Sequence, residues 1–300
     1  MKSHILYAIF AVLILIFSFS NAFAQEITFG KKAQQTIEIS IDEKGTAHVV
    51  HKVLGSSSTQ QVETYQGVNS NLSVIDRDGN SMQYLTLQKN PIAVVLPPTS
   101  KDLVLIKYDL SDVISPKDGV WTWNYSGTEV TSFRFPKGVD MVWVNDRPAY
   151  FGDTGIRHHG GSMVLEYVIN EPMILKEVEW EGQKFTVGIR TLTNVGAFEF
   201  SQSTKSITFD IAKENSLVTT IIPLKLLWRP YDVYLGSNMT LHSEFHNNGT
   251  HVWLGFRPHT AGTIQIKGTT VVPEFPIFVP LTIGISLVIL VQLRSRFIFR

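Results

Sequence analysis

The feature that most constrains the fold is the spacing of the apolar residues, which alternate with a period of two along the middle of the chain. In the stretch TIEISIDEKGTAHVVHKV, the residues Ile37, Ile39 and Ile41 share one side of an extended strand, and the alternation resumes after a turn at Gly45. Successive side chains of a strand point to opposite faces of a sheet, so this spacing buries one face and leaves the other in solvent. Residues 36–53 therefore predict two strands joined by a turn.

Short alternating runs separated by turn residues continue to about residue 270. No internal stretch keeps an apolar period of 3.6 residues over two turns; LKEVEWEGQ comes nearest, and Gly182 closes it. Many short strands with glycine and proline turns are typical of antiparallel β-sandwiches. Pro172 favours an extended conformation at the residue before it and ends a strand. The sequence therefore predicts an all-β fold with two tandem antiparallel β-sandwich domains, residues 25–170 and 171–270.

The start of the chain has a different character from the middle. Lys2 precedes an apolar run, Ile5–Phe17, and the small residues of Ala22-Phe23-Ala24 follow it. A positive start, a short apolar stretch and an A-x-A site are the three parts of a secretory signal peptide. We expect residues 1–24 to be such a signal peptide, with an uncleaved anchor as the alternative.

The end of the chain carries a second apolar run. Residues 277–293 contain no charge and are followed by Arg294, Arg296 and Arg300. A helix of that length is about 25 Å long, which suffices for a thin hydrocarbon core; a buried core helix is the alternative. Because positive residues stay on the cytoplasmic side, residues 294–300 predict a cytoplasmic tail. Both ends together predict a single-pass protein of the cell membrane with an extracellular ectodomain.

Residues 271–276 join the expected ectodomain to the expected span, and they contain the motif Pro273-Glu274-Phe275-Pro276. A Pro-Glu-Phe motif, an apolar span and a short basic tail resemble the C-terminal signature of archaeal exported surface proteins. The stretches FTVGIRTLTNVGAFEFS, SITFDIA, IIPLKLLWRPYDVYLG, GTHVWLGF and GTIQIKGTTVVPEFP also resemble the β-sandwich module that precedes this anchor in such proteins. The resemblance implies that the tail is a substrate of sorting enzymes, which replace the span with a lipid, and that the module presents another domain. It implies no catalytic residue.

Composition excludes several classes of protein. Without Lys2, Glu274 and the three C-terminal arginines, the chain has 22 basic and 25 acidic residues, a formal charge of −3. Nucleic-acid binding needs a concentrated basic surface, so we expect no nucleic-acid partner. The chain has no cysteine, which excludes disulfides, thiolate zinc sites and cysteine nucleophiles. The sequence has no nucleophile elbow, zinc-protease helix, P-loop or dinucleotide fingerprint, and we expect no enzyme.

Four N-x-S/T patterns mark acceptor sites for N-linked glycans, at Asn71, Asn124, Asn238 and Asn248. Chance alone would supply one or two in a chain this rich in Asn, Ser and Thr. Because we expect the chain to be exported, all four are predicted glycosylation sites.

The segment LHSEFHNNGTHVWLGF contains a candidate metal site. A two-residue turn of type I′ at Asn248-Gly249 would pair His246 with His251. Alternation would then place the apolar residues Leu241, Phe245, Val252, Leu254 and Phe256 toward the core. The opposite face would carry His242, Glu244, His246 and His251.

Cross-strand and same-face neighbours lie about 5–7 Å apart, close enough for these side chains to meet on one ion. Imidazole and carboxylate ligands suit copper(II) or zinc. The alternative, which we favour, is the solvent face of an ordinary hairpin. We therefore expect no cofactor, and copper or zinc is the competing hypothesis.

A second set of possible metal ligands lies at Asp76, Asp78 and Asn80, a pattern that resembles part of a calcium loop. A calcium loop of the EF-hand type ends with a bidentate glutamate, whereas position 87 is leucine. The sequence Asp78-Gly79-Asn80 between two alternating runs predicts a hairpin turn instead.

These features together predict a non-enzymatic, membrane-anchored protein of the cell surface with a structural, adhesive or display role. The expected partners are the lipid bilayer and other cell-envelope proteins or glycans. One alternative is an envelope protein that binds copper or zinc through His242, Glu244, His246 and His251. A third hypothesis is a hydrolase whose triad is assembled from residues far apart in the sequence.

Overall fold

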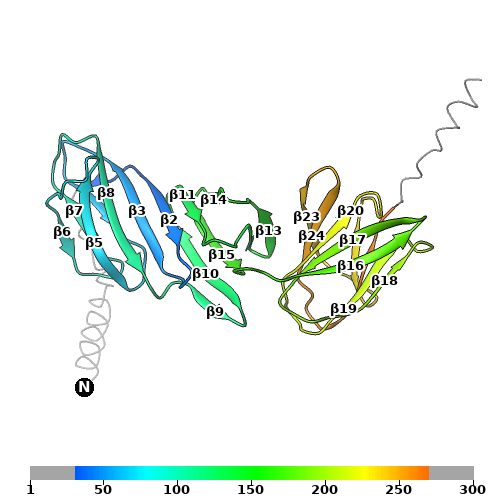
Figure 1. Ribbon diagram of the computed structural model, residues 1–300. Helices are drawn as coiled ribbons and strands as arrows, with labels where there is room; N and C mark the ends of the chain where they lie inside the picture. Colours follow the sequence, from blue (N-terminus) through cyan, green and yellow to red (C-terminus); the bar gives the residue numbers. More distant parts are fainter. Residues whose placement is uncertain (1–30, 270–300) are drawn as a thin grey trace, which may run out of the picture. The chain divides into compact units, whose positions relative to one another are not determined.

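The computed structural model describes residues 31–269, and all of their regular secondary structure is β (Figure 1). Twenty-five strands are present between these residues and no helix is, so the prediction of an all-β fold with several sheets is confirmed. Accordingly, this part of the chain contains no helix that could cross a bilayer. The predicted signal peptide, the Pro-Glu-Phe motif and the predicted span lie outside the described residues.

The chain forms two compact units. Among the described residues, the first comprises 31–38 and 49–109, and the second comprises 39–48 and 110–269. The predicted domain boundary at residues 170 and 171 therefore falls inside the second unit. Three strands have residues in both units: β2 (Gln35–Ile41), β3 (Ala47–Leu54) and β8 (Leu103–Leu110).

The first unit contains a four-stranded sheet in the order β1-β4-β7-β6. Its central strand β7 is made only of buried apolar residues, Ala93 to Leu96. The pairing of β1 with β4 is parallel, which departs from the antiparallel arrangement that the sequence predicts. The strands are β1 (Lys31–Lys32), β4 (Gln60–Glu63), β6 (Leu85–Leu87) and β7 (Ala93–Leu96), and the unit also contains β5 (Asn69–Asp76).

The turn predicted at Asp78-Gly79-Asn80 is confirmed, but the long hairpin is not. Asp76 Oδ1 accepts the backbone N–H groups of Asp78 at 3.0 Å and Asn80 at 2.9 Å, which fixes the turn. Beyond the turn, β5 is followed by one antiparallel bridge, Ile75 to Ser81, and β6 then pairs with β7. The pairing with β6 gives the buried strand β7 hydrogen-bond partners on its second edge, since β4 occupies the first. The long hairpin was predicted wrongly for this reason.

The second unit contains three five-stranded sheets and the pair β11–β14. The first sheet has the order β13-β12-β15-β10-β9. Aromatic side chains pack at its inner side: the ring of Tyr125 meets Trp123 and Phe133 edge-on, at centroid distances of 5.4 and 5.0 Å. The strands are β9 (Ser115–Lys117), β10 (Val120–Gly127), β11 (Thr131–Arg134), β12 (Met141–Val144), β13 (Arg147–Tyr150), β14 (Ile156–His158) and β15 (Gly161–Tyr167).

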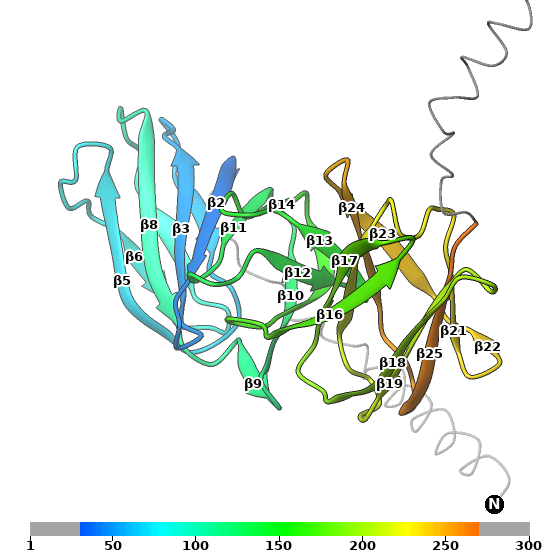
Figure 2. The ribbon, with the colours of Figure 1, turned by 45° about the vertical axis from the view of Figure 1, so that its right-hand side comes forward.

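The other two sheets are built from residues 173–267 and have the orders β16-β17-β20-β24-β23 and β18-β19-β25-β21-β22 (Figure 2). Their inward side chains meet in one hydrophobic core, to which Val187, Phe209 and Ile266 contribute with full burial. The strands are β16 (Met173–Trp180), β17 (Gln183–Arg190), β18 (Val195–Ser201), β19 (Ser206–Ile211), β20 (Val218–Pro223), β21 (Asp232–Leu235), β22 (Asn238–Met239), β23 (His242–Asn247), β24 (His251–Phe256) and β25 (Gly262–Lys267).

Strand β16 covers most of LKEVEWEGQ, the internal stretch whose apolar spacing comes nearest to that of a helix. It pairs along its whole length with β17, from Met173 opposite Arg190 to Trp180 opposite Gln183. The two turn residues, Glu181 and Gly182, both have positive φ (51° and 73°), as a type I′ hairpin turn requires. The turn and the neighbouring strand therefore determine the structure of this segment.

A buried arginine connects the sheets of the second unit. The two Nη atoms of Arg190, on β17, donate to the Asp140 carboxylate at 2.8 and 3.0 Å, and Nε donates to Glu171 Oε2 at 2.9 Å. The side chains of Arg190 and Glu171 are 9% and 4% exposed. Burial raises the pKa of Glu171, while the charge of Arg190 acts in the opposite direction. Beside this network, the first sheet of the unit and the loop before β20 share a small apolar cluster: Met141, Trp143, Val168 and Leu217.

Candidate functional site

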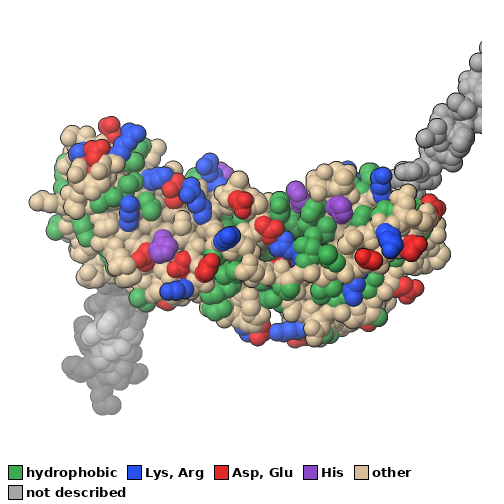
Figure 3. All heavy atoms as spheres, viewed as in Figure 1, with side chains coloured by type: hydrophobic (Ala, Val, Ile, Leu, Met, Phe, Trp, Pro, Cys, Tyr) green, Lys and Arg blue, Asp and Glu red, His purple; other side chains and the backbone are tan. Residues whose placement is uncertain are grey.

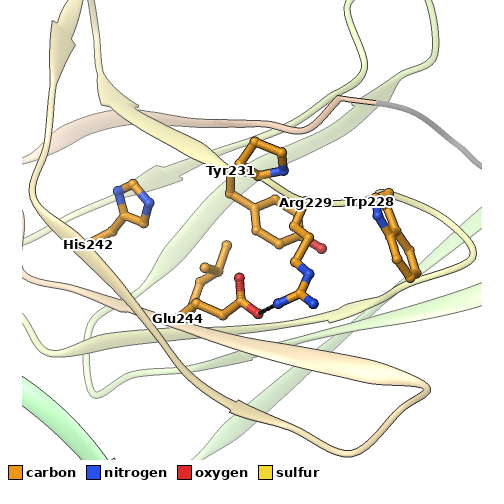
Figure 4. Close-up of a pocket in the computed structure, with 7 residues that line it drawn as sticks. Trp228, Arg229, Tyr231, His242 and Glu244 are labelled. Carbon is orange, nitrogen blue, oxygen red and sulfur yellow. Dashed lines mark hydrogen bonds and ion pairs between the residues drawn. The ribbon is translucent and has the colours of Figure 1, made fainter.

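An open pocket of about 520 Å³ lies in the second unit, where the segment before β21 faces β23 (Figure 4). It combines an aromatic ring, an arginine, a glutamate and a histidine around an apolar floor. Seven residues line it: Trp228, Arg229, Pro230, Tyr231, His242, Glu244 and Leu254.

The wall formed by residues 228–231 is held in place by the core beneath it. Leu226 and Leu227 are fully buried, and their N–H groups both donate to Pro223 O, at 3.0 and 3.2 Å. The Tyr231 hydroxyl donates to Leu227 O at 2.8 Å. Burial raises the pKa of the Tyr231 hydroxyl well above its usual range, so it acts as a hydrogen-bond donor and not as a base.

The polar groups of the pocket face one another across its opening. Arg229 Nη1 donates to Glu244 Oε1 at 3.2 Å, and both side chains reach solvent, with 54% and 28% exposure. A pair this exposed contributes at most about 1 kcal/mol to stability, so a ligand can displace it at little cost. The Trp228 side chain is exposed at the rim, where an indole can stack on a flat apolar group.

The seven lining residues include no serine, threonine, cysteine or lysine. The pocket therefore offers groups for stacking and hydrogen bonding. Sequence reasoning did not single out Trp228 or Arg229. A tryptophan-arginine-proline run directly after two leucines is a signal that could have indicated an exposed turn beside a buried strand.

The predicted register of the hairpin β23–β24 is wrong by two residues near its tip and by one residue farther from it. His246 lies opposite Trp253, and not opposite His251, and Asn247 lies opposite Val252. The turn is centred on Gly249 and Thr250, because Asn248 N–H donates to His251 O at 3.2 Å. Gly249 has φ +86°, which a type II′ hairpin requires at its first central position. An irregularity between Glu244 and His246 absorbs the extra residue.

The predicted core face of the hairpin is largely confirmed. Val252, Leu254 and Phe256 are buried, and Phe245 is partly buried against the cluster that contains Leu217. Leu241 is the exception, because its side chain is 91% exposed. It precedes β23 and lies outside the strand pairing, so the alternation of the strand does not extend to it.

The structure does not bring the four predicted metal ligands together. The ring of His246 lies 4.3 Å from that of Tyr150 and 4.5 Å from that of Trp253, measured between centroids. Glu244 pairs with Arg229, and His242 Nδ1 lies 3.3 Å from Thr240 O. Between residues 31 and 269, no three His, Cys, Asp or Glu side chains are grouped so that they could hold a metal ion. The copper or zinc site stays a prediction, because the described residues show no cluster of its proposed ligands.

The turn that resembles a calcium loop holds a lysine ammonium group. Lys101 Nζ lies 2.8 Å from Asp76 Oδ2 and 3.8 Å from Asp78 Oδ2. The hydrogen bond from Lys101 is the largest of the effects that hold the pKa of Asp76 below its usual range. A positive side chain thus occupies the position where a cation would contact these carboxylates.

The four predicted glycosylation sites are all exposed. Asn124 lies on β10, Asn238 on β22, and Asn248 at the tip of the β23–β24 hairpin. Asn71 lies on β5, where its Nδ2 donates to Asp109 Oδ2 at 2.7 Å. Accessibility is the structural condition for attaching a glycan. The attachment itself stays a prediction.

Comparison with known proteins gives no family for this chain. No family model matches it, and no curated protein does. A solved structure with partial likeness is that of the aminopeptidase N family protein from Idiomarina loihiensis, with 10% sequence identity and a TM-score of 0.33. The match covers 51% of this chain and 32% of that protein, so the chain spans about a third of its length. At this TM-score the likeness carries no conclusion about function.

Proposed function

We propose that this chain is a non-enzymatic surface protein that displays an all-β ectodomain outside the cell. In this proposal, residues 1–24 direct export, residues 277–293 span the membrane, and residues 294–300 remain in the cytoplasm. Two tandem antiparallel β-sandwich domains, residues 25–170 and 171–270, form the displayed part. The surface in Figure 3 supports a role without nucleic acid, because basic and acidic side chains are interspersed over the face it shows.

The observation that carries the proposal is the exposure of all four acceptor asparagines, Asn71, Asn124, Asn238 and Asn248. An acceptor pattern in a buried strand would be unusable, whereas every one of these four is accessible to a glycosylating enzyme. Together with the two apolar ends of the sequence, this favours an exported glycoprotein with an adhesive or display role. Its partners are the lipid bilayer and other cell-envelope proteins or glycans.

The motif Pro273-Glu274-Phe275-Pro276 belongs to the same proposal. Its place between the last strand and the predicted span is the place where a sorting enzyme would act. Cleavage there would exchange the span for a lipid anchor without releasing the ectodomain from the membrane.

The experiment expresses the full chain in an archaeal host that glycosylates exported proteins. We expect the protein in the membrane fraction after an alkaline wash, accessible to protease added outside the cell, and reduced in mass when all four acceptor asparagines are changed to glutamine. A matched chain that ends at residue 270 should be released into the medium. Recovery of the full chain in the cytoplasm, with an unmodified mass, would overturn the proposal.

A further inference from the structure

One end of the sheet β18-β19-β25-β21-β22 is where the described chain leaves the fold. Strand pairing aligns four residues in a row near this end: Ser201 opposite Ser206, Ser206 opposite Lys267, and Lys267 opposite Asp232. Beyond this row lie the turn before β19, the segment before β21 and the last described residue, Thr269.

Thr269 is tied to the neighbouring segments at this end. Its N–H donates to Trp228 O at 3.0 Å, and its hydroxyl donates to Arg229 O at 2.7 Å. Lys205 Nζ donates to Thr269 O at 2.8 Å, and Gly268 N–H donates to Lys205 O at 3.0 Å. The point from which the chain continues toward residue 277 is therefore fixed beside Trp228, Arg229 and Lys205.

Leu241 lies at the same end of the sheet. The N–H of Thr240 donates to Val233 O at 2.8 Å, so the next residue, Leu241, lies beside Asp232 at the end of the sheet. We call the four exposed residues around the chain's exit the exit rim: Lys205, Trp228, Arg229 and Leu241.

The exit rim combines apolar and basic side chains that are exposed to solvent. Leu241 is 91% exposed and Trp228 is 37% exposed, and the Arg229 side chain is 54% exposed. Two acidic groups lie near it: Glu244, which pairs with Arg229, and Asp232, which lies opposite Lys267 in the sheet. Lys267 Nζ in turn lies 4.7 Å from the centre of the Tyr234 ring.

Tryptophan, with an apolar body and a polar N–H, is enriched at the boundary between lipid and water. Lysine and arginine reach toward lipid phosphates while their stems stay on apolar surface. A leucine with almost no protein contact suits the same layer, because burying it there gains about the transfer free energy of one apolar side chain. The composition of the exit rim therefore fits a bilayer surface better than open water.

The length of the remaining chain brings this surface within reach. Eight residue steps separate Thr269 from Ile277, the first residue of the predicted span. At about 3.3–3.6 Å per residue, the exit rim can lie no more than about 29 Å from the hydrocarbon boundary, and a shorter path brings it to the headgroups. Pro273 and Pro276 interrupt this linker, and neither continues a helix.

We propose that the exit rim rests on the outer leaflet, with Trp228 and Leu241 in the headgroup layer and Lys205 and Arg229 directed toward lipid phosphates. This inference rests on the proposed membrane anchor. It adds that the ectodomain is held against the bilayer in one orientation, which keeps the opposite end of the same sheet away from the membrane. The pocket of Figure 4 then opens close to the lipid surface, because Trp228 and Arg229 belong to both.

Because the chain has no cysteine, a single introduced cysteine gives a label at one defined place. The experiment uses the full chain in lipid nanodiscs that contain anionic lipid, with an environment-sensitive fluorophore on L241C or W228C. The matched control is E214C, an exposed position in the loop after β19, at the opposite end of the sheet. We expect a blue shift of the emission at 241 and 228, with quenching by a quencher attached to the lipid headgroup, and neither effect at 214.

L241C tests the inference even if W228C perturbs the fold, because Leu241 makes almost no contact within the protein. Emission at 241 that equals emission at 214, in nanodiscs that retain the protein after an alkaline wash, would overturn the exit-rim proposal and leave the anchor intact. Failure of the full chain to stay with the nanodiscs would instead overturn the anchor, and the inference with it. Loss of the blue shift at 241 in W228A/R229A would show that the rim acts as one surface.

Discussion

At the scale of single residues, the first unit contains a histidine that burial favours in its neutral form. His51 is 1% exposed and lies between Gln35 and Tyr108, with Nδ1 at 2.8 Å from Gln35 Oε1 and Nε2 at 2.8 Å from the Tyr108 hydroxyl. The Tyr108 oxygen also accepts the N–H of Tyr65 at 2.9 Å. Because the Gln35 oxygen can only accept, Nδ1 donates to it, and a neutral imidazole then accepts the Tyr108 hydroxyl proton at Nε2.

Burial lowers the pKa of His51 from 6.5 to about 4. Between these two values the unfolded chain binds a proton that the folded chain does not, so stability is complete above pH 6.5 and falls as the pH falls toward 4. A difference of this size corresponds to about 3 kcal/mol of unfolding free energy across the window. We expect urea unfolding of the wild type to lose about half of this between pH 6.5 and 5, and His51→Gln to lose much less. Equal slopes for the two proteins would contradict this assignment.

At the scale of elements, the β23–β24 hairpin shows which part of a local structure a sequence pattern predicts. Alternation correctly predicts that Val252, Leu254 and Phe256 face the core, because burial of one face dominates the energetics of a strand. The turn was predicted at Asn248 and Gly249, but it is centred on Gly249 and Thr250, and the Asn248 side chain accepts hydrogen bonds from the residues that follow it. Its Oδ1 accepts the N–H of Thr250 at 3.0 Å, the Thr250 hydroxyl at 2.9 Å and the N–H of His251 at 2.8 Å.

These bonds predict how the hairpin responds to substitution. Asn248→Ala removes three hydrogen bonds at an exposed turn, and we expect it to lower the unfolding free energy by about 1 kcal/mol. Asn248→Asp keeps an oxygen in the same position and should restore most of the loss, although both substitutions abolish the glycan acceptor. Denaturant unfolding of protein made without glycosylation measures the comparison. Equal stability of the alanine and aspartate variants would show that the side-chain bonds do not hold the turn.

At the scale of the whole molecule, the class of fold is predictable from the sequence, but the contacts between sheets are not. An apolar period of two indicates strands, because successive side chains of any strand point to opposite faces of its sheet. The pairing of β6 with β7, and not with β5, depends on which buried edge needs hydrogen bonds, and no local pattern encodes that choice. The pocket was missed for the same reason: Trp228 and His242 meet only after two sheets have packed.

The Arg190 network is also a whole-molecule feature, since its three residues lie on separate segments. Asp140 is 50 residues from Arg190 in sequence, and Glu171 is 19 residues away. Within the sequence, each is an ordinary charged residue at a strand end. In the second unit they form an ionic contact between the sheet of β12 and the sheet of β17, in which Arg190 and Glu171 are buried, beside the apolar cluster of Met141 and Leu217.

Removing the arginine would leave the Glu171 carboxylate buried without its cation. We expect Arg190→Met to lower the unfolding free energy at pH 7 by about 3–5 kcal/mol, the usual result of breaking a buried ion pair from one side. The pKa of Glu171 is already raised by burial, and it should rise further in the variant. A group with a raised folded pKa favours folding at low pH, so the loss should shrink as the pH falls from 7 toward 5 and Glu171 becomes protonated. Lys213→Met is the matched control, since it removes an exposed pair with Asp118 and should change little at either pH. A loss for Arg190→Met that is the same at pH 5 and pH 7 would show that the buried carboxylate is not its cause.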